Sequence, residues 1–188
     1  TMKLTKDTTS TLSKTTISLH WIVAILIIGL LGSGLYMENF KAFFLMSWHK
    51  SFGVMLLAFA LLRVTWRIVN GWPKHDVKHP NYEQVLAKIV HYVLIISMLL
   101  MPISGLIMSG FGGHGAEVFG LELIPHNPNP ENPQKSLAFN QGLAEIGKTV
   151  HGITANALLI ALGLHIVGAL KHHIIDKDNT LTRMLGKK

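Results

Sequence analysis

The sequence contains no cysteine, and it has few charged side chains for its length of 188 residues. Without cysteine the chain forms no disulfide, holds no thiolate-ligated haem or cysteine-bound iron–sulfur cluster, and cannot attach c-type haem. Charged residues make up 14% of the chain, well below the share in a typical soluble domain, whereas hydrophobic residues make up 49%. The mean hydropathy is +0.38. This composition indicates an integral membrane protein.

The net charge of +7 does not indicate a nucleic-acid-binding protein. The basic residues flank the long apolar runs and do not build one soluble face, which is the distribution of a chain oriented across a membrane. We therefore expect membrane lipid, and no nucleic acid, among the partners of this chain.

Four apolar stretches each approach the length that a helix needs to cross about 30 Å of hydrocarbon. They run from about 19–37, 49–69, 89–108 and 150–170. The third stretch carries Pro102, which predicts a kink. The outer loop at about 109–148 is rich in glycine and then in proline, so we expect turns there rather than long helices. The pattern predicts an all-α, integral membrane four-helix bundle that forms a single domain over 1–188.

The distribution of charge predicts how the bundle is oriented. Four spans place the N-terminal arm, the second loop and the C-terminal tail on one side, which holds thirteen of the seventeen Lys and Arg residues. With five acidic residues on each side, the two sides carry net charges of +8 and −1. Both termini are therefore expected in the cytoplasm. All four tryptophans stand near expected span ends, as in an interfacial belt: Trp21, Trp48, Trp66 and Trp72.

Five of the eleven histidines lie in or at the spans, where a metal-binding side chain is a functional candidate because burying it is costly. His151 and His165 are separated by about four helical turns, so they face the same side about 21 Å apart. The span directions place His49 level with His151 near the outer surface, and His20 level with His165 near the inner one. Facing histidines at two depths predict two bis-histidine haem sites.

Several features of these sites stay open at this level. Two axial ligands leave the iron no open position, which favours electron transfer over oxygen chemistry. His91 opens the third span at the inner depth, so depth alone does not exclude it as a ligand. Gly34 follows His20 by fourteen residues, where a glycine leaves room for a porphyrin. Arg63 follows His49 by the same spacing, where a cation can meet haem propionates. An ordinary membrane glycine and an interfacial arginine are the alternative interpretations.

Four segments carry a resemblance to a known family: SLHW at 18–21, WHKSFG at 48–53, GLH followed by HH at 163–173, and HHIIDKDNTLTRML at 172–185. Together they make nearly the whole chain similar to the prokaryotic cytochrome b561 family. The resemblance implies a multi-pass protein of the bacterial cytoplasmic (inner) membrane with two non-covalent haem b groups. It implies the matching histidines as ligands and so favours His20 over His91; these ligands are His20, His49, His151 and His165.

The resemblance also directs attention to quinone as an exchangeable substrate. His172 lies about two helical turns beyond His165 and continues the same stripe toward the cytoplasm. Reduction of quinone needs protons, which a histidine at a wet interface can supply. We therefore take His172, with Lys171 and Trp21, as the candidate quinone site; the alternative is that His172 and Lys171 bind lipid headgroups. Lys50 is a candidate for outer haem propionates or for attracting superoxide, or an ordinary interface lysine.

Three hypotheses for the function follow. The first is a dihaem b-type cytochrome that transfers electrons across the membrane to or from quinone, with superoxide or a redox partner protein on the outer side. Some members of the family that the chain resembles look like superoxide:quinone oxidoreductases. A quinone-linked oxidoreductase activity is therefore one to test in this electron-transfer protein. The second is a membrane anchor cytochrome that relays electrons for a separate dehydrogenase. The third, a histidine-lined metal-ion transporter, predicts a colourless protein.

Overall fold

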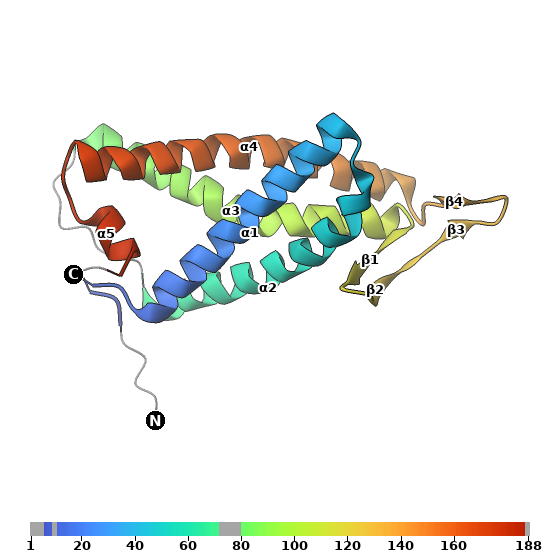
Figure 1. The fold of residues 1–188 in the computed structure, drawn as a ribbon, viewed down its shortest axis with the longest axis horizontal. Coiled ribbons are helices and arrows are strands. Elements are labelled where there is room, and N and C mark those ends of the chain that lie inside the picture. Colours follow the sequence, from blue (N-terminus) through green and yellow to red (C-terminus); the bar gives the residue numbers. More distant parts are fainter. Residues whose placement is uncertain (1–5, 9–10, 72–79, 187–188) are drawn as a thin grey trace, which may run out of the picture.

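Four long helices dominate the structure, which is a computed structural model describing residues 6–8, 11–71 and 80–186 (Figure 1). Trp72, His75 and His79 lie outside the described residues. A short 3₁₀ helix, η1 (Phe43–Leu45), leads into the second long helix, and the short α5 (Thr180–Met184) follows the fourth. The long helices are α1 (Lys14–Phe40), α2 (Met46–Asn70), α3 (Asn81–Phe111) and α4 (Gln141–Ile174).

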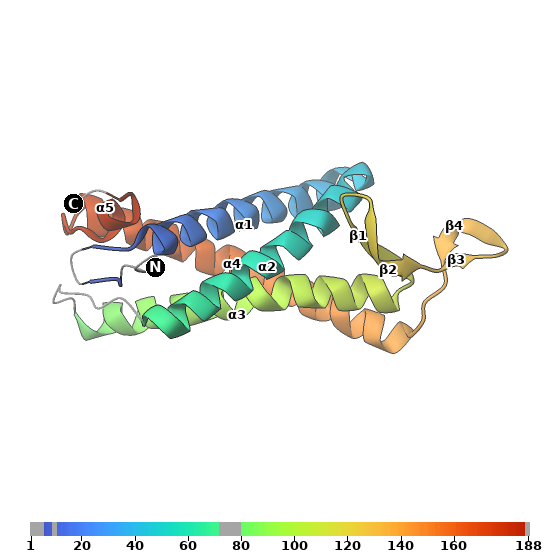
Figure 2. The same ribbon diagram turned by 90° about the horizontal axis from the view of Figure 1, so that it is seen from below.

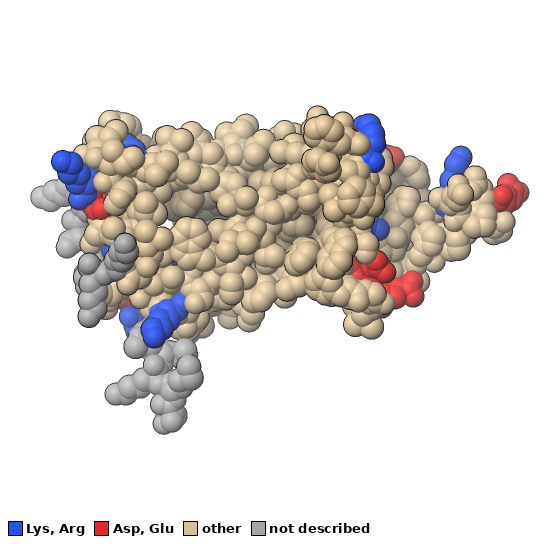
Figure 3. All heavy atoms as spheres, viewed as in Figure 1, with Lys and Arg blue, Asp and Glu red and all other residues tan. Residues whose placement is uncertain are grey.

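All four long helices are long and apolar enough to cross a membrane. This confirms the predicted membrane helices, and each helix extends beyond its apolar stretch. Ser13 Oγ accepts a hydrogen bond from Thr16 N–H at the start of α1, and Asn140 does the same for Leu143 N–H at the start of α4. Charged side chains gather at the two ends and leave an uncharged band between them (Figure 3).

We call the end that carries both chain termini the inner end and the opposite end the outer end (Figure 1). The names follow the predicted orientation, in which both termini face the cytoplasm. That orientation stays a prediction.

The core is a stripe of large apolar side chains at the centre of the bundle. Val23, Ile27 and Leu31 recur every four residues along α1 and therefore lie on one face. They pack with a cluster from the other helices: Leu56, Ala60, Met98 and Leu158. The opposite face of α1 exposes Ile25 and Ile28, as a helix in contact with lipid does.

The helices α3 and α4 pack closely near the outer end because Gly147 has no side chain. A Cβ atom at Gly147 would lie 2.6 Å from the backbone nitrogen of Met108. Pro102 lies buried inside α3. Pro102 lines the same pocket as His151, and Gly147 lies one turn before His151 on α4.

The outer connection contains two antiparallel hairpins, which corrects the all-α expectation to a mostly helical fold (Figure 2). The first pairs β1 (His114–Val118) with β2 (Leu121–His126), and the second pairs β3 (Pro128–Asn129) with β4 (Asn132–Ser136). Phe119 and Gly120 link β1 to β2, and both have positive φ, as a two-residue hairpin turn requires. The sequence correctly predicted a connection without long helices. Its strands are too short to show a clear alternation of apolar and polar residues, so the sequence did not predict them.

Polar contacts tie the inner end together. Asp7 forms an ion pair with Arg67 at 2.7 Å, and its side chain is only 3% exposed. The Asp7 carboxylate also accepts hydrogen bonds from Ser13 N–H and Thr16 Oγ1. Trp66 Nε1 donates to Thr16 Oγ1 at 2.8 Å. The arm before α1 is thereby clamped to the end of α2.

Candidate functional site

The outer pair of histidines lies in one apolar pocket between the helices. His49 comes from the first turn of α2 and His151 from α4, and both line a pocket with an empty volume of about 330 Å³, counting the space open to the surroundings. The rest of the lining is apolar: Ile27, Leu30, Leu31, Gly53, Leu56, Met101, Pro102 and Leu158. The structure therefore brings together the two histidines that the sequence placed at the same outer depth.

His49 is held by a serine on the neighbouring helix α1. Its Nδ1 lies 2.9 Å from Ser33 Oγ, and Ser33 Oγ donates to Leu30 O at 3.0 Å. Because the single hydroxyl proton of Ser33 goes to Leu30 O, Ser33 accepts the proton of His49 Nδ1–H. The network assigns the proton of a neutral His49 to Nδ1 and leaves Nε2 unprotonated. That is the form in which a histidine ligates a metal.

His151 is held in the same way by α3. Its Nδ1 lies 3.0 Å from Met101 O and 3.2 Å from Ser104 Oγ, and Ser104 Oγ itself donates to Met101 O. A carbonyl oxygen only accepts, so His151 carries its proton on Nδ1 and presents an unprotonated Nε2. His151 has two acceptors where His49 has one.

A glycine follows each of these serines and lies beside the histidine ring. A Cβ atom at Gly34 would lie 3.6 Å from His49 Cε1, and one at Gly105 would lie 3.3 Å from His151 Cε1. The Ser-Gly pair of α1 thus faces α2 as the Ser-Gly pair of α3 faces α4. Gly34 lies at the outer level that the sequence predicted, whereas Ser33, Ser104 and Gly105 were missed. Their shared pattern, a serine followed directly by a glycine, is too common in sequences to have identified them.

The inner pair lies at the opposite end of the bundle. The ring centroids of His20 on α1 and His165 on α4 are 6.2 Å apart, with an angle of 57° between the planes. Two imidazoles bonded at about 2 Å to one metal ion between them would place their centroids about 6 Å apart. The distance therefore fits a shared ligand position.

Arg63 of α2 stands directly against the inner pair, where the sequence predicted a cation. Its Nη2 donates to His20 Nδ1 at 3.0 Å. Because a guanidinium has no acceptor, His20 Nδ1 must accept, and a neutral His20 carries its proton on Nε2. Iron ligation through Nε2 of His20 therefore requires Arg63 to exchange this hydrogen bond for another acceptor.

His91 belongs to the same inner cluster. Its ring centroid is 5.3 Å from that of His165, and its Nδ1 donates to Ala87 O at 2.7 Å. The Nε2 of a neutral His91 is then unprotonated, as in the two outer histidines. The geometry leaves His91 in competition with His20, and the choice of His20 as the ligand stays a prediction.

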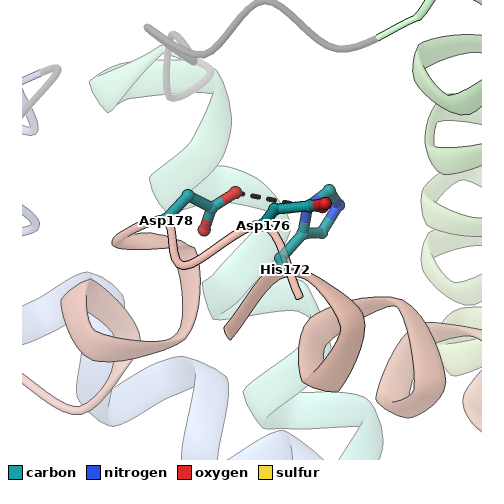
Figure 4. Close-up of side chains that lie close together, drawn as sticks. All are labelled: His172, Asp176 and Asp178. Atoms are coloured by element: carbon teal, nitrogen blue, oxygen red, sulfur yellow. Dashed lines mark ion pairs between the residues drawn. The ribbon is translucent and has the colours of Figure 1, made fainter. Parts of the chain in front are cut away.

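The candidate quinone residue His172 is held between two carboxylates (Figure 4). His172 Nδ1 lies 2.9 Å from Asp176 Oδ2 and 3.2 Å from Asp178 Oδ2, and the three ligand atoms lie within 4.8 Å of one another. Asp178 also accepts from Thr180 N–H at the start of α5. The sequence did not point to the two aspartates, because they lie in the irregular turn after α4.

Lys171 and Trp21, the other two candidate quinone residues, have structural partners at this end. Lys171 Nζ binds Glu83 of α3 at 2.8 Å and Asp176 at 3.1 Å. The hydrogen bond from Lys171 lowers the pKa of Asp176 below its usual range, so Asp176 stays ionised beside His172. Trp21 Nε1 donates to Met184 O at 2.9 Å, which attaches α5 to α1.

Lys50 attaches the first hairpin to α2 at the outer end. Its Nζ donates to the carbonyl oxygens of His114 and Gly115 at 3.2 and 3.0 Å, so it fastens β1 to α2. Ser51 accepts from Phe119 N–H at 3.0 Å and strengthens the same attachment. The predicted contacts of Lys50 with a propionate or a small anion stay predictions.

The chemistry of both clusters fits haem. The outer site offers two neutral imidazoles with Nε2 unprotonated, an apolar pocket and side-chain-free positions at Gly34 and Gly105. The inner site offers a histidine pair at a suitable separation and a cation to balance propionate charge. Both pairs contain imidazole alone, the axial donor that b-type haem accepts.

Known proteins match this chain over most of its length. The family model described as prokaryotic cytochrome b561 matches residues 11–187. Cytochrome b561 homolog 2 of Escherichia coli (strain K12) is 30% identical over 175 residues, covering 89% of this chain and 87% of that protein. The probable superoxide oxidase CybB of Yersinia pestis is 30% identical over 176 residues, covering 92% and 94%. Cytochrome b561 homolog 1 of Escherichia coli (strain K12) is 27% identical over 182 residues, covering 94% and 97%.

Proposed function

Because the chain belongs to the prokaryotic cytochrome b561 family, whose members transfer electrons in membranes with b-type haem, we propose that it holds two haem b groups and exchanges electrons with quinone. His49 and His151 would hold the outer haem, and His20 and His165 would hold the inner haem. When bound, each haem would supply a one-electron redox centre.

The anchoring of the two outer histidines carries this proposal. Ser33 and Ser104 hold His49 and His151 by Nδ1 from two different helices, with a glycine beside each ring. Metal-ligating histidines commonly donate their second ring N–H to such a partner, which fixes both the tautomer and the ring orientation. Two histidines that served only to fill space would not both need a hydrogen-bond acceptor for Nδ1 on a neighbouring helix.

At the inner site, Arg63 is the residue that must change partner. It donates to His20 Nδ1, and a haem propionate is the kind of acceptor that draws a guanidinium away. His20 is then able to carry its proton on Nδ1 and ligate through Nε2. Arg63 compensates the propionate charge in the low-dielectric bundle.

His172 holds the proton for quinone at the inner end. Quinone takes up two electrons and two protons when it becomes quinol, so the site needs a proton carrier next to the route of the electrons. Asp176 and Asp178 fix His172 Nδ1, which leaves Nε2 as the nitrogen that meets quinone. Lys171 keeps the network in place through Glu83 and Asp176.

Haem content is the first test of the proposed function. Purified protein should contain two non-covalent, six-coordinate, low-spin haem b groups per chain, counted by pyridine haemochrome and by the visible spectrum. His49→Ala and His151→Ala should each remove one and the same haem, and His20→Ala and His165→Ala the other. His91→Ala is the control and should keep both. A colourless protein, one haem per chain, or loss of a shared haem in His20→Ala and His49→Ala would contradict the assignment.

Superoxide is the electron donor to test at the outer end, because one relative carries the name of a probable superoxide oxidase. Each superoxide that loses one electron becomes O₂, so two superoxide ions reduce one quinone with two protons. A pulse of superoxide should reduce the purified protein, measured at its α-band against full chemical reduction. A protein that stays oxidised would exclude superoxide and favour the anchor hypothesis, in which a dehydrogenase subunit copurifies and reduces it.

A further inference from the structure

A pocket with both charged and apolar lining opens at the inner end, between the start of α1 and α5. Its empty volume is about 850 Å³, counting the space open to the surroundings. Figures 1 and 2 both place α5 close to the first turns of α1. The lining residues are Thr11, Leu12, Lys14, Ile17, Ser18, Arg183 and Gly186. The lining combines two cations, two hydroxyl groups and apolar side chains.

Two tryptophans mark the depth of this pocket. Trp21, one turn after Ile17, donates to Met184 O next to Arg183, and Trp66 donates to Thr16 Oγ1. Indole rings with a satisfied N–H and an apolar body prefer the headgroup region at the edge of the hydrocarbon. The pocket therefore lies where phospholipid headgroups lie, and it opens beside apolar helix surface that acyl chains cover.

The two cations of the pocket lack a carboxylate partner within the described residues. Arg183 is 6% exposed; its Nη2 donates to Thr8 O, but its Nε has no hydrogen-bond partner in the described part of the chain. The nearby carboxylate of Asp7 is already paired with Arg67. A buried guanidinium without a counter-charge is costly, so the pocket favours an anion.

We propose that this pocket binds the phosphate headgroup of an anionic phospholipid. Lys14 and Arg183 balance the phosphate charge, Ser18 offers a hydroxyl donor, and Leu12 and Ile17 meet the glycerol and the first acyl carbons. Basic pockets between helices on the cytoplasmic side recognise lipid headgroups in this way. Quinone is uncharged, so two cations in the pocket would not favour its binding. The lipid would fasten α5 to α1.

Lipid binding by the holoprotein tests the proposal independently of haem ligation and quinone chemistry. Native mass spectrometry of the detergent-purified protein should show more bound phosphatidylglycerol than phosphatidylcholine at equal concentration. Arg183→Gln and Lys14→Gln should each weaken phosphatidylglycerol binding about fivefold, as expected for the loss of one interfacial cation. Lys88→Gln, which removes a charge from α3 near the same end but outside the pocket, should bind as the parent does.

Each contrary outcome overturns the proposal. Arg183→Gln also removes the hydrogen bond to Thr8, so Lys14→Gln, on an exposed side chain, is the decisive variant. Equal phosphatidylglycerol binding by Lys14→Gln and the parent would mean that no headgroup occupies the pocket. Equal binding of the two lipids would remove the charge argument. Displacement of phosphatidylglycerol by inorganic phosphate at equal concentration would assign the pocket to a free anion.

Discussion

Ser33 and Ser104 perform the same task for the outer histidines, but with different support. His151 donates to Met101 O as well as to Ser104, whereas Ser33 is the described acceptor for His49 Nδ1. A hydroxyl that merely fills space would be replaced by alanine at little cost. A hydroxyl that fixes a tautomer would not.

We therefore expect Ser33→Ala to weaken haem retention at the outer site about tenfold to a hundredfold, the usual cost of losing the partner of a ligating histidine. Ser104→Ala should have a smaller effect, because Met101 O still accepts from His151. Transfer of haem to an acceptor protein measures both. Ser97→Ala, a buried serine of α3 outside the pocket, is the control. An effect of Ser104→Ala as large as that of Ser33→Ala would argue against the anchoring explanation.

At the inner end, His172 and His173 are neighbours with different surroundings. His172 is half-buried between Asp176 and Asp178, whereas His173 is exposed. If His172 delivers protons to quinone, His172→Ala should leave both haem spectra intact. Reoxidation of the reduced protein by added quinone should slow by about a hundredfold or more, the cost of losing a positioned general acid. His173→Ala should reoxidise normally, and equal small effects at both positions would place quinone elsewhere.

Among the elements, the clamp between the N-terminal arm and α2 depends on an ionised carboxylate. Burial alone would raise the pKa of Asp7, but hydrogen bonds from Ser13 N–H, Arg67 and Thr16 outweigh burial and lower it below its ordinary value of 3.8. A carboxylate with a lowered pKa adds stability above that ordinary value. The added stability is lost as the pH falls through the folded-state pKa.

Asp7→Ala should therefore destabilise the protein at neutral pH by about 3 kcal/mol, because Arg67 is left buried without its partner. The thermal midpoint in detergent, measured from pH 7 down to pH 3, checks the effect. The difference between the parent and Asp7→Ala should be constant near neutrality and shrink below about pH 4. Lys6→Ala, an exposed neighbour in the arm, is the control. A difference that does not shrink in acid would show that charge is not what Asp7 contributes.

For the whole molecule, orientation is the property on which every depth assignment rests. The +8 side carries both termini, so a reporter fused to the C-terminal end should be active only as a cytoplasmic reporter. A fusion in the β3–β4 hairpin should be active only outside. Paired phosphatase and fluorescent-protein fusions measure both positions in one experiment. Phosphatase activity at the C-terminal end would mean that the bundle is oriented the other way, with the sites named inner and outer exchanged.

The sequence by itself determined the number of spans and predicted which of the four candidate ligand histidines lie level with each other. Hydropathy over some twenty residues is a local property, and a helix rises by about 1.5 Å per residue wherever it packs, so spacing along the chain becomes depth. This is why His49 and His151, and likewise His20 and His165, were expected level with each other before any contact was known. The side of the membrane was predicted from charge on the same local basis.

Only the tertiary structure decided which side chains meet across the helices. Contacts depend on how each helix is rotated against its neighbours, and apolar surfaces that face lipid do not fix that rotation. Ser33 therefore reaches His49, and Arg63 reaches His20, through packing that spacing does not encode. The pairing of Asp7 with Arg67 and the pocket at Arg183 join segments far apart in the chain. Their partners are chosen by the folded chain, because no local pattern links residues that meet only after the bundle forms.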